Sequence, residues 1–398
     1  MTGPAAVRTG VVVVGAGLAG WTVADTLRTE GYAGDVTVVG AEEHAPYDRP
    51  PLSKDFLAGR VGRPDLTLGG GSDDVTWRLG RRAVALDVPT RTVTLDDAST
   101  VTGDHVVLAT GAAARRLPGP HGAVHTVATL DDAERLRAAV RPGTRAVVAG
   151  AGFLGLEVAA SLTGLGADVT VVCAAAGPLL REIGPDASAA VLRLHEGHGV
   201  RVLTGARVSG VGGPRGRRRG RTSVDGPSGP VAVVLEDGRE IAADLVVVAA
   251  GADPASAWLA GSGLRLDGGV VCDDAGLAAP GVHAVGDCAV WAGERCSHWT
   301  RTVRQARRVA AVVAHGRPPE ADAEPDYVWS DQYDARLQLA GSLRGDETSE
   351  VVCADGGLFV VFRSGDEEVA AFALNQSRQL MRWRKTHRRR PAAERIPA

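Results

Sequence analysis

The sequence predicts an α/β protein that contains two Rossmann-like dinucleotide-binding domains. Three observations predict this fold class. Two segments, at residues 11–39 and 145–172, each read as strand, glycine-rich turn, helix and second strand. A further apolar strand, late in the chain, ends in Gly286-Asp287. With 398 residues, the chain is long enough for two or three domains.

The composition is that of an ordinary globular protein. Apolar residues make up 44% of the chain, charged residues make up 23%, and the net charge is −3. So small a net charge predicts no overall attraction to nucleic acid or to a membrane surface. No apolar run reaches membrane-spanning length, and the N-terminal segment lacks the pattern of a signal peptide. We therefore expect a cytoplasmic protein.

The first nucleotide-binding turn is predicted within residues 11–20, VVVVGAGLAG. A β-branched run leads into the Gly-x-Gly-x-x-Gly spacing, and residues 35–39 supply the second strand. The first glycine permits the tight turn, the second lets a pyrophosphate approach the backbone, and the third lets helix and strand pack closely. The predicted cofactor contacts in this turn are Gly15, Ala16, Gly17, Leu18, Ala19 and Gly20.

The same pattern recurs in residues 145–172, so the chain is predicted to bind two dinucleotides. In each unit the helix N-terminus offers free amides and the positive end of a dipole to phosphates. One such spacing alone is weak, but chance is a poor explanation for two complete units. The predicted contacts in the second turn are Gly150, Gly152, Phe153, Leu154 and Gly155.

Three quieter signals accompany these turns. The segment at 281–289, GVHAVGDCA, places a glycine and a carboxylate at the end of an apolar strand. A carboxylate in that place can accept a hydrogen bond from a ribose or ribityl hydroxyl. The segments HVVLATG and VVVAAGADP also end strands at glycine. The predicted contacts in these segments are Ala109, Thr110, Gly111, Gly251, Gly286 and Asp287.

The loop at residues 46–56, PYDRPPLSKDF, combines rigidity with positive charge. Its adjacent prolines preset an extended or turning backbone, and Arg49 and Lys54 flank them. Such cations often do no more than face water, and the loop alone leaves that interpretation open.

The order of these motifs resembles flavoproteins of the glutathione reductase type, in which an FAD domain is interrupted by an NAD(P)H domain. Within this group, three segments resemble the FAD-dependent NAD(P)H:ferredoxin reductases of oxygenase systems, the family of putidaredoxin reductase. These segments are PYDRPPLSK, HWTRTVRQARRVAAVVAHG (298–316) and YVWSDQYDARLQLAG (327–341). The resemblance implies an FAD domain at 1–113 and 248–320 and an NAD(P)H domain at 114–247, both Rossmann-like, plus a C-terminal α+β domain at 321–398 that serves as an interface domain.

The same resemblance implies a catalytic pair, Lys54 and Glu157, beside the flavin. A fixed cation there would stabilise the negative charge of reduced flavin without reorganisation. Glu42 is the expected acceptor for the FAD ribose, although Gly40 occupies the strand-end position where many flavoproteins carry the acid. Either of the two tryptophans among the remaining contacts could instead be an ordinary core residue. The further FAD contacts implied by the resemblance are Arg49, Val84, Arg137, Trp299 and Trp329.

Several positions depart from the family pattern. Cys173 stands where NADH-preferring members carry a glutamate, and no arginine follows directly to receive a 2′-phosphate. We expect NADH at this site and leave NADPH open. Ala128, Ser297 and Arg301 also replace the residues that the family would place there.

The implied activity is electron transfer from NADH through FAD to a small iron–sulfur ferredoxin that serves a P450 or a Rieske oxygenase. A flavin disulfide reductase is disfavoured because the cysteines, at 173, 272, 288, 296 and 353, form no close pair. A coenzyme A disulfide reductase would need a thiol near the 46–56 loop, which has Ser53 instead. A redox sensor related to apoptosis-inducing factor remains the alternative, and no metal site is expected.

Two basic segments stand outside the nucleotide motifs. They are an Arg- and Gly-rich insertion at 210–230 and a tail, MRWRKTHRRR, at 381–390. Basic surfaces would steer the approach of an acidic ferredoxin. Ordinary solvated surface charge is the alternative explanation for both segments.

Overall fold

The computed structural model describes residues 9–69, 74–117, 122–213, 230–295, 298–319, 324–353 and 355–387. Most of the 210–230 insertion, Ser297, Cys296 and the end of the basic tail therefore lie outside the described residues.

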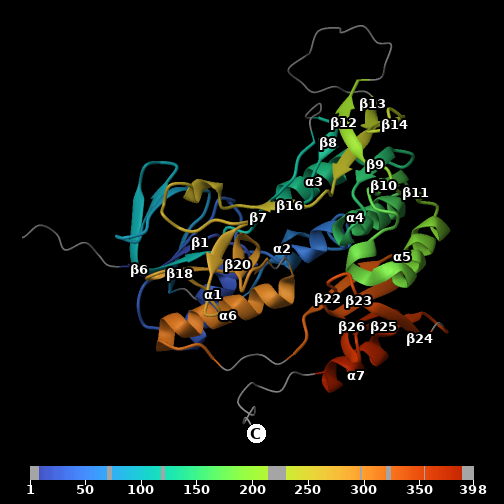
Figure 1. Ribbon diagram of the computed structural model, residues 1–398. Helices are drawn as coiled ribbons and strands as arrows, with labels where there is room; N and C mark the ends of the chain where they lie inside the picture. Colours follow the sequence, from blue (N-terminus) through green and yellow to red (C-terminus); the bar gives the residue numbers. More distant parts are fainter. Residues whose placement is uncertain are drawn as a thin grey trace, which may run out of the picture.

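The first nucleotide-binding unit is built around β1 (Thr9–Val14), which has parallel partners on both sides. The sheet runs in the order β18-β19-β6-β1-β2-β3. Val11, Val12 and Val13 are fully buried, which explains the unbroken β-branched run of the sequence. Helices α1 (Leu18–Thr29) and α6 (Trp299–His315) lie side by side against this sheet (Figure 1). The other strands of this part are β2 (Val36–Val39), β3 (Val75–Arg78), β4 (Ala83–Asp87), β5 (Thr92–Leu95), β6 (Thr100–Leu108), β17 (Val270–Cys272), β18 (Leu277–Ala279), β19 (Val282–Ala284), β20 (Ala289–Trp291) and β21 (Glu294–Arg295).

The second unit is a parallel sheet in the order β11-β10-β9-β15-β8. An antiparallel ribbon of three strands, β12-β13-β14, packs beside it. The kink in α5 falls at Gly184, whose φ is 72°, directly before Pro185. The elements are β8 (Val124–His125), α3 (Leu130–Ala139), β9 (Arg145–Ala149), α4 (Phe153–Gly164), β10 (Asp168–Val172), α5 (Leu180–Gly197), β11 (Arg201–Leu203), β12 (Val208–Gly212), β13 (Val231–Leu235), β14 (Glu240–Ala243) and β15 (Leu245–Val248).

The chain enters and leaves the second unit through neighbouring strands. On the way in it forms β7 (Ala112–Ala114), and on the way out β16 (Ala252–Pro254) pairs with β7 antiparallel. Beyond this crossing, β19 returns to the first sheet and pairs with β6. The domain boundaries at 113/114 and 247/248 remain our proposal, and they fall inside β7 and before the last residue of β15.

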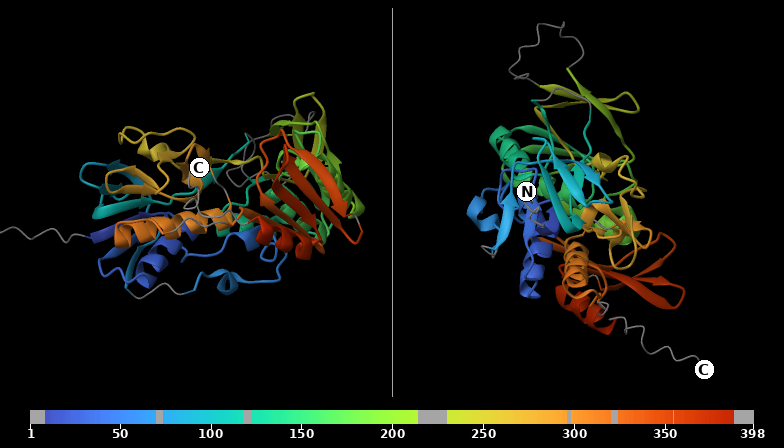
Figure 2. Two further views of the ribbon diagram at one scale, coloured as in Figure 1. Left: turned by 60° about the horizontal axis from the view of Figure 1, so that its bottom comes forward. Right: turned by 90° about the vertical axis from the view of Figure 1, so that its left-hand side faces the viewer.

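The C-terminal part is an antiparallel sheet in the order β22-β23-β26-β25-β24, covered by a helix. It packs beside the second nucleotide-binding unit (Figure 2). The helix includes Met381 to Thr386, so the basic tail begins as an ordered helix. The elements are β22 (Tyr327–Gln332), β23 (Ala335–Gly341), β24 (Thr348–Cys353), β25 (Leu358–Ser364), β26 (Glu367–Leu374) and α7 (Ser377–Thr386).

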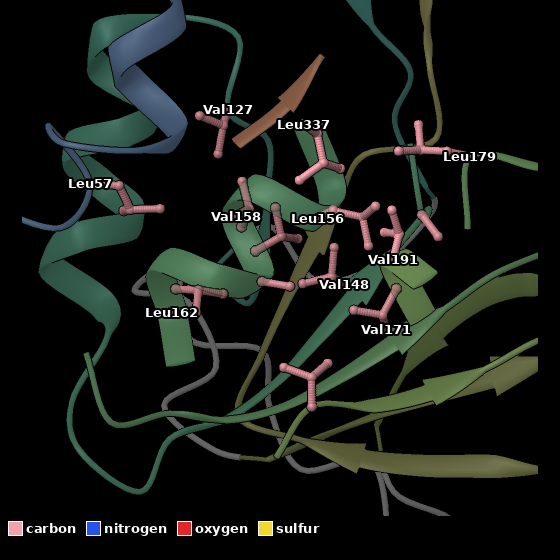
Figure 3. Packing of buried hydrophobic residues seen from close by; sticks show 14 of the residues in the cluster. Leu57, Val127, Val148, Leu156, Val158, Leu162, Val171, Leu179, Val191 and Leu337 are labelled. Atoms are coloured by element: carbon pink, nitrogen blue, oxygen red, sulfur yellow. The ribbon is translucent and has the colours of Figure 1, made fainter. Parts of the chain in front are cut away.

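One buried hydrophobic cluster takes side chains from all three parts. It includes Leu57 from the loop that follows the 3-10 helix η1 (Pro50–Ser53), Leu156 and Val158 from α4, and Leu337 from β23 (Figure 3). Packing of this kind fixes the 46–56 loop against α4 and the C-terminal sheet. The remaining short helices are α2 (Arg63–Leu66), η2 (Ala257–Leu259) and η3 (Gly286–Cys288).

None of the helices in the described part of the chain is both long enough and apolar enough to cross a membrane.

Candidate functional site

The first glycine turn closes so tightly that two of its glycines admit no side chain. Gly15 has a φ of 121°, and a Cβ there would lie 2.1 Å from the carbonyl oxygen of Ala109. A Cβ on Gly20 would lie 1.8 Å from the carbonyl oxygen of Gly15. The predicted Ala109 contact is therefore the backbone that closes the turn.

The space before α1 fits a phosphate. Gly17 caps the helix, so the first amides of the helix have no partner within it. A Cβ on Gly17 would meet nothing closer than the guanidinium of Arg49, at 3.8 Å. A helix N-terminus faced by a cation is a natural place for an anion. The rest of the predicted turn, Ala16, Leu18 and Ala19, lies in this segment.

The second turn repeats this geometry. Gly150 also has a φ of 121°, and a Cβ there would lie 2.2 Å from the carbonyl oxygen of Ala249. A Cβ on Gly155 would lie 2.1 Å from the carbonyl oxygen of Gly150, whereas nothing lies within 4 Å of one on Gly152. The open position again caps a helix, α4, whose first residues are Phe153 and Leu154.

The expected ribose acceptor, Glu42, has both carboxylate oxygens engaged. Oε1 accepts from Arg49 at 2.6 Å and Oε2 accepts from the Tyr47 hydroxyl at 2.6 Å. An acidic residue at position 40 could not fit without a shift, because a Cβ there would lie 2.6 Å from the Cβ of Ala16. The absence of an acid at the strand end thus has a packing cause.

Gly286 and Asp287 lie beside the first turn. A Cβ on Gly286 would come within 3.3 Å of the Cβ of Ala19, and the Gly286 amide donates to Gln305 at 2.9 Å. Burial raises the pKa of the Asp287 carboxyl, against the opposing charges of Arg295 and Arg49. A largely buried carboxyl at this place suits a hydroxyl donor from a ligand.

Lys54 and Glu157 form an ion pair between the two nucleotide-binding units. Lys54 Nζ lies 2.8 Å from Glu157 Oε2, and the two side chains are only 13% and 8% exposed. Ser53 also donates to Oε2, and Ser330 donates to Oε1 at 2.6 Å. Three donors therefore converge on one carboxylate and fix its position.

An aromatic cluster is linked to this ion pair through Asp48. Trp299 is 37% exposed, so it is not a core residue, and its Nε1 donates to Asp48 Oδ1 at 3.1 Å. The ring of Trp329 meets that of Trp299 edge to face at 6.1 Å and stacks on Tyr327 at 5.7 Å. Burial raises the pKa of the Asp48 carboxyl, opposed by the Trp299 hydrogen bond and the charge of Lys54.

The remaining predicted contacts each have interactions of their own. Arg49 faces Gly17 and Glu42, so it does not share the place of Lys54. Arg137 packs beneath Gly59, in the last turn of α3. Val84 is 44% exposed on β4. The predicted contacts at 110–111 and at Gly251 lie in turns that follow strands. The Thr110 hydroxyl donates to the carbonyl of Ala255 at 2.8 Å, and Gly111 and Gly251 have φ of 68° and 90°.

Three of the positions that depart from the family pattern, Cys173, Ala128 and Arg301, lie in the described part of the chain and have defined partners. The Cys173 thiol is buried and donates to the carbonyl of Gly177 at 3.4 Å, and burial raises its pKa. The Ala128 carbonyl accepts a hydrogen bond from Arg49. Arg301 lies between Glu294 and Asp326, at 3.3 and 3.7 Å.

The cysteines near the first sheet are unsuited to thiol chemistry. Cys272 and Cys288 are buried and not disulfide-bonded. Burial raises the pKa of the Cys288 thiol and raises that of Cys272 to about 12, so neither is a ready thiolate. Among the described residues, no three His, Cys, Asp or Glu side chains are grouped so that they could hold a metal.

Sequence reasoning did not identify Asp48, Ser53, Tyr47 or Ser330 as parts of the site. For Ser330 a signal was present. Ser330 and Gln332 are polar residues two apart on one strand, so they share a face, and both are buried. Paired polar residues on a buried face indicate a partner that is also polar.

Comparison with known proteins places this geometry in a family. The model of the pyridine nucleotide-disulphide oxidoreductases matches residues 9–309, and a reductase C-terminal domain model matches residues 327–396. The chain is 36% identical to the ferredoxin reductase component of chlorobenzene dioxygenase from Cupriavidus sp. (strain PS12), over 85% of this chain and 82% of that protein. It is also 36% identical to rhodocoxin reductase from Rhodococcus erythropolis, over 94% and 88%.

The fold agrees with these matches. The structure of the covalent putidaredoxin reductase–putidaredoxin complex superposes with a TM-score of 0.87 and 31% identity, covering 96% of this chain and 93% of that one. The predicted fold class, with two dinucleotide-binding units and a C-terminal domain, is confirmed. This chain belongs to the pyridine nucleotide-disulphide oxidoreductase family, in the branch that carries the reductase C-terminal domain.

Proposed function

We infer that this protein is an FAD-dependent oxidoreductase that passes electrons from NADH to a small iron–sulfur ferredoxin. The observation that carries this inference is the buried Lys54–Glu157 ion pair, which stands between the two nucleotide-binding units where a disulfide reductase would need a reactive thiol pair. The similarity to ferredoxin reductases over most of the chain adds support.

The first glycine turn is our proposed FAD site. The α1 amides and Arg49 would hold the pyrophosphate, and Asp287 would accept from a ribityl or ribose hydroxyl. Glu42 would accept from the ribose only if it exchanges one of its present donors, Arg49 or Tyr47. The lining of the site would also include Val84 and the turns at 109–111 and 286–287, whereas Arg137, whose guanidinium packs against Gly59, would have a structural role.

The second turn is our proposed nicotinamide-dinucleotide site, formed by residues 150–155 with Gly251 opposite. Cys173 offers neither a carboxylate for ribose hydroxyls nor a cation for a 2′-phosphate. NADH is our choice, and its margin over NADPH is expected to be small.

When bound, FAD would accept a hydride from NADH and release the electrons singly to the ferredoxin. The protein supplies position and charge. Glu157, fixed by two serines, holds the ammonium group of Lys54 in one place, so its positive charge needs no reorganisation. Trp299 and Trp329 would cover the site and exclude water.

The relatives also indicate the place of this chain in an electron-transfer system. Chlorobenzene dioxygenase has a ferredoxin reductase component, and rhodocoxin and putidaredoxin have reductases of this kind. We propose that the ferredoxin reduced here serves a Rieske oxygenase or a P450, and that the domain at 321–398 contributes to the interface.

Stopped-flow mixing of the flavin-loaded protein with NADH, then with NADPH, tests the proposal. Rapid bleaching by NADH, followed by cytochrome c reduction only when a [2Fe–2S] ferredoxin is added, is the expected result. Slow bleaching by both nucleotides, or a long-lived charge-transfer complex that never reduces ferredoxin, would instead indicate the sensor function.

A further inference from the structure

A line of buried hydrogen bonds leads away from Glu157 into the C-terminal sheet and on to α5. Ser330 contacts Glu157 Oε1, and Gln332 Nε2 lies 3.0 Å from Ser330 Oγ. Gln332 Oε1 lies 2.8 Å from His195 Nε2, and the Tyr333 hydroxyl lies 3.0 Å from His195 Nδ1. Ser330, Gln332 and His195 are each at most 1% exposed.

The charge at one end determines the direction of every bond in this line. An ionised carboxylate only accepts, so Ser330 must donate to Glu157 and its oxygen accepts from the Gln332 amide. The carbonyl oxygen of Gln332 therefore faces His195, which must donate from Nε2. Its Nδ1 is then an acceptor and receives the Tyr333 hydroxyl. All four donors point toward the carboxylate.

This line holds charge in place and does not conduct protons. A side-chain amide has no proton to pass on without losing its own bonding, so Gln332 interrupts any relay. Aligned donors polarise one another and strengthen the bond at the charged end. Burial lowers the pKa of His195, which keeps its ring neutral, as this bonding pattern requires.

The line also joins separate parts of the molecule. His195 lies near the end of α5 in the second nucleotide-binding unit, and Gln332 ends β22 in the C-terminal sheet. Tyr333 has a φ of 55° and its ring stacks on His198 at 3.7 Å, so the outer end of the line is also fixed.

We propose that His195 is a positioning residue that acts through Gln332 and Ser330 to hold the Glu157 carboxylate in place beside Lys54. The consequence for flavin reduction rests on the proposed function, in which Lys54 faces the flavin. The hydrogen-bond order itself does not rest on it.

The order of the bonds is tested first, by NMR of wild-type protein carrying ¹⁵N-labelled histidine. The ring shifts and couplings of His195, assigned by their loss in His195→Gln, should show a neutral ring protonated at Nε2 at pH 7. A ring protonated at Nδ1, or at both nitrogens, would overturn the proposal. Because this readout needs no electron transfer, it stands even if the ferredoxin reductase assignment fails.

Stopped-flow reduction by NADH then tests the functional consequence, with the limiting rate separated from the NADH Kd. Ser330→Ala and His195→Leu should lower the limiting rate about tenfold at unchanged Kd, since each removes support for a charged group. His195→Gln keeps a donor near Nε2 and should restore most of the rate.

Ser188→Ala is the matched control, because Ser188 is a buried serine of α5 whose hydroxyl donates to Pro178, outside the line. It should reduce flavin at the wild-type rate. Wild-type rates in both Ser330→Ala and His195→Leu, or a His195→Gln variant as slow as His195→Leu, would contradict the proposal. Should the substituted proteins fail to fold, the NMR result on the wild type still decides it.

Discussion

Glu157 is the residue on which the most interactions of the site converge. It lies on α4, directly after the second glycine turn, and receives Lys54 and Ser53 from one loop and Ser330 from another domain. Removing the partner of a carboxylate so enclosed costs several kcal/mol of stability, roughly 3–5 kcal/mol, and the same holds for the lysine beside it.

Glu157→Gln should therefore destabilise the protein and slow its reduction. The amide leaves the Lys54 charge uncompensated in a site where it is 13% exposed, at a cost of about 3 kcal/mol in the free energy of unfolding. Urea unfolding of the flavin-loaded protein measures this. Glu134→Gln, which breaks the exposed Arg63–Glu134 pair, is the control and should cost far less. Equal losses in the two variants would contradict the buried role of Glu157.

His283 gives the first sheet a sensitivity to acid. It is 2% exposed, neither ring nitrogen has a partner among the described residues, and the His105 ring lies 5.6 Å away. Burial lowers its pKa from 6.5 to about 4, with a further lowering by His105 against the opposing effect of Asp273. Below pH 6.5, His283 binds a proton in the unfolded chain, whereas in the folded protein it stays neutral until about pH 4. Stability therefore falls as the pH drops through this window.

His283→Leu should flatten that dependence. The loss of unfolding free energy between pH 6.5 and pH 4 should shrink by on the order of 2–3 kcal/mol, because the leucine binds no proton in either state. Thermal midpoints measured across the window give the comparison. His315→Leu, at an exposed helix end, controls for the loss of one histidine. Parallel curves for wild type and His283→Leu would show that another group causes the acid response.

At the scale of elements, the two glycine turns are near copies that should serve different ligands. Gly17 caps α1 with φ and ψ of −81° and −168°, and Gly152 caps α4 with −79° and −179°. Neither backbone conformation requires glycine, and neither position is crowded by the chain itself. A methyl group at either position should therefore affect ligand binding without disturbing the fold.

Gly17→Ala should weaken FAD binding about tenfold or more, because the methyl group occupies the approach of the pyrophosphate. Gly152→Ala should keep its flavin and weaken NADH binding by a similar factor. The absorbance of the purified proteins reports flavin content, and titration with NADH reports the second site. Flavin loss in Gly152→Ala with retention in Gly17→Ala would reverse our assignment of the two turns.

These same elements show what a sequence can predict and what it cannot. A glycine turn is local: its three glycines, two strands and one helix lie within thirty residues, so the spacing determines the structure. The Lys54–Glu157 pair spans more than one hundred residues, and only family resemblance predicted it. Nothing in the sequence predicted that His195 would meet Gln332, since that contact depends on how α5 packs against β22.

At the scale of the whole molecule, the C-terminal sheet does more than cover the nucleotide-binding units. It supplies Ser330 to the ion pair and Trp329 to the aromatic cluster, while α6 supplies Trp299. The exposed edge of this cluster lies at the start of α6, a helix that carries Arg301, Arg304, Arg307 and Arg308. A helix rich in arginine beside the proposed flavin site suits the approach of an acidic ferredoxin.

Ionic strength should therefore separate the two half-reactions. Electron transfer to an acidic ferredoxin should slow steeply as salt rises from 0.01 to about 0.2 M, because screening removes the long-range attraction. Reduction by NADH, which depends on close contacts, should change little.

Arg307→Glu places the opposite charge at an exposed position on α6 and should lower the bimolecular rate with ferredoxin roughly three- to tenfold at low salt. Arg239→Glu, in the β13–β14 turn at the far end of the molecule from α6 (Figures 1 and 2), makes the same charge change away from the site and should leave that rate near wild type. If both variants slow the ferredoxin step equally, net charge alone governs the encounter and α6 is not the face that the ferredoxin approaches.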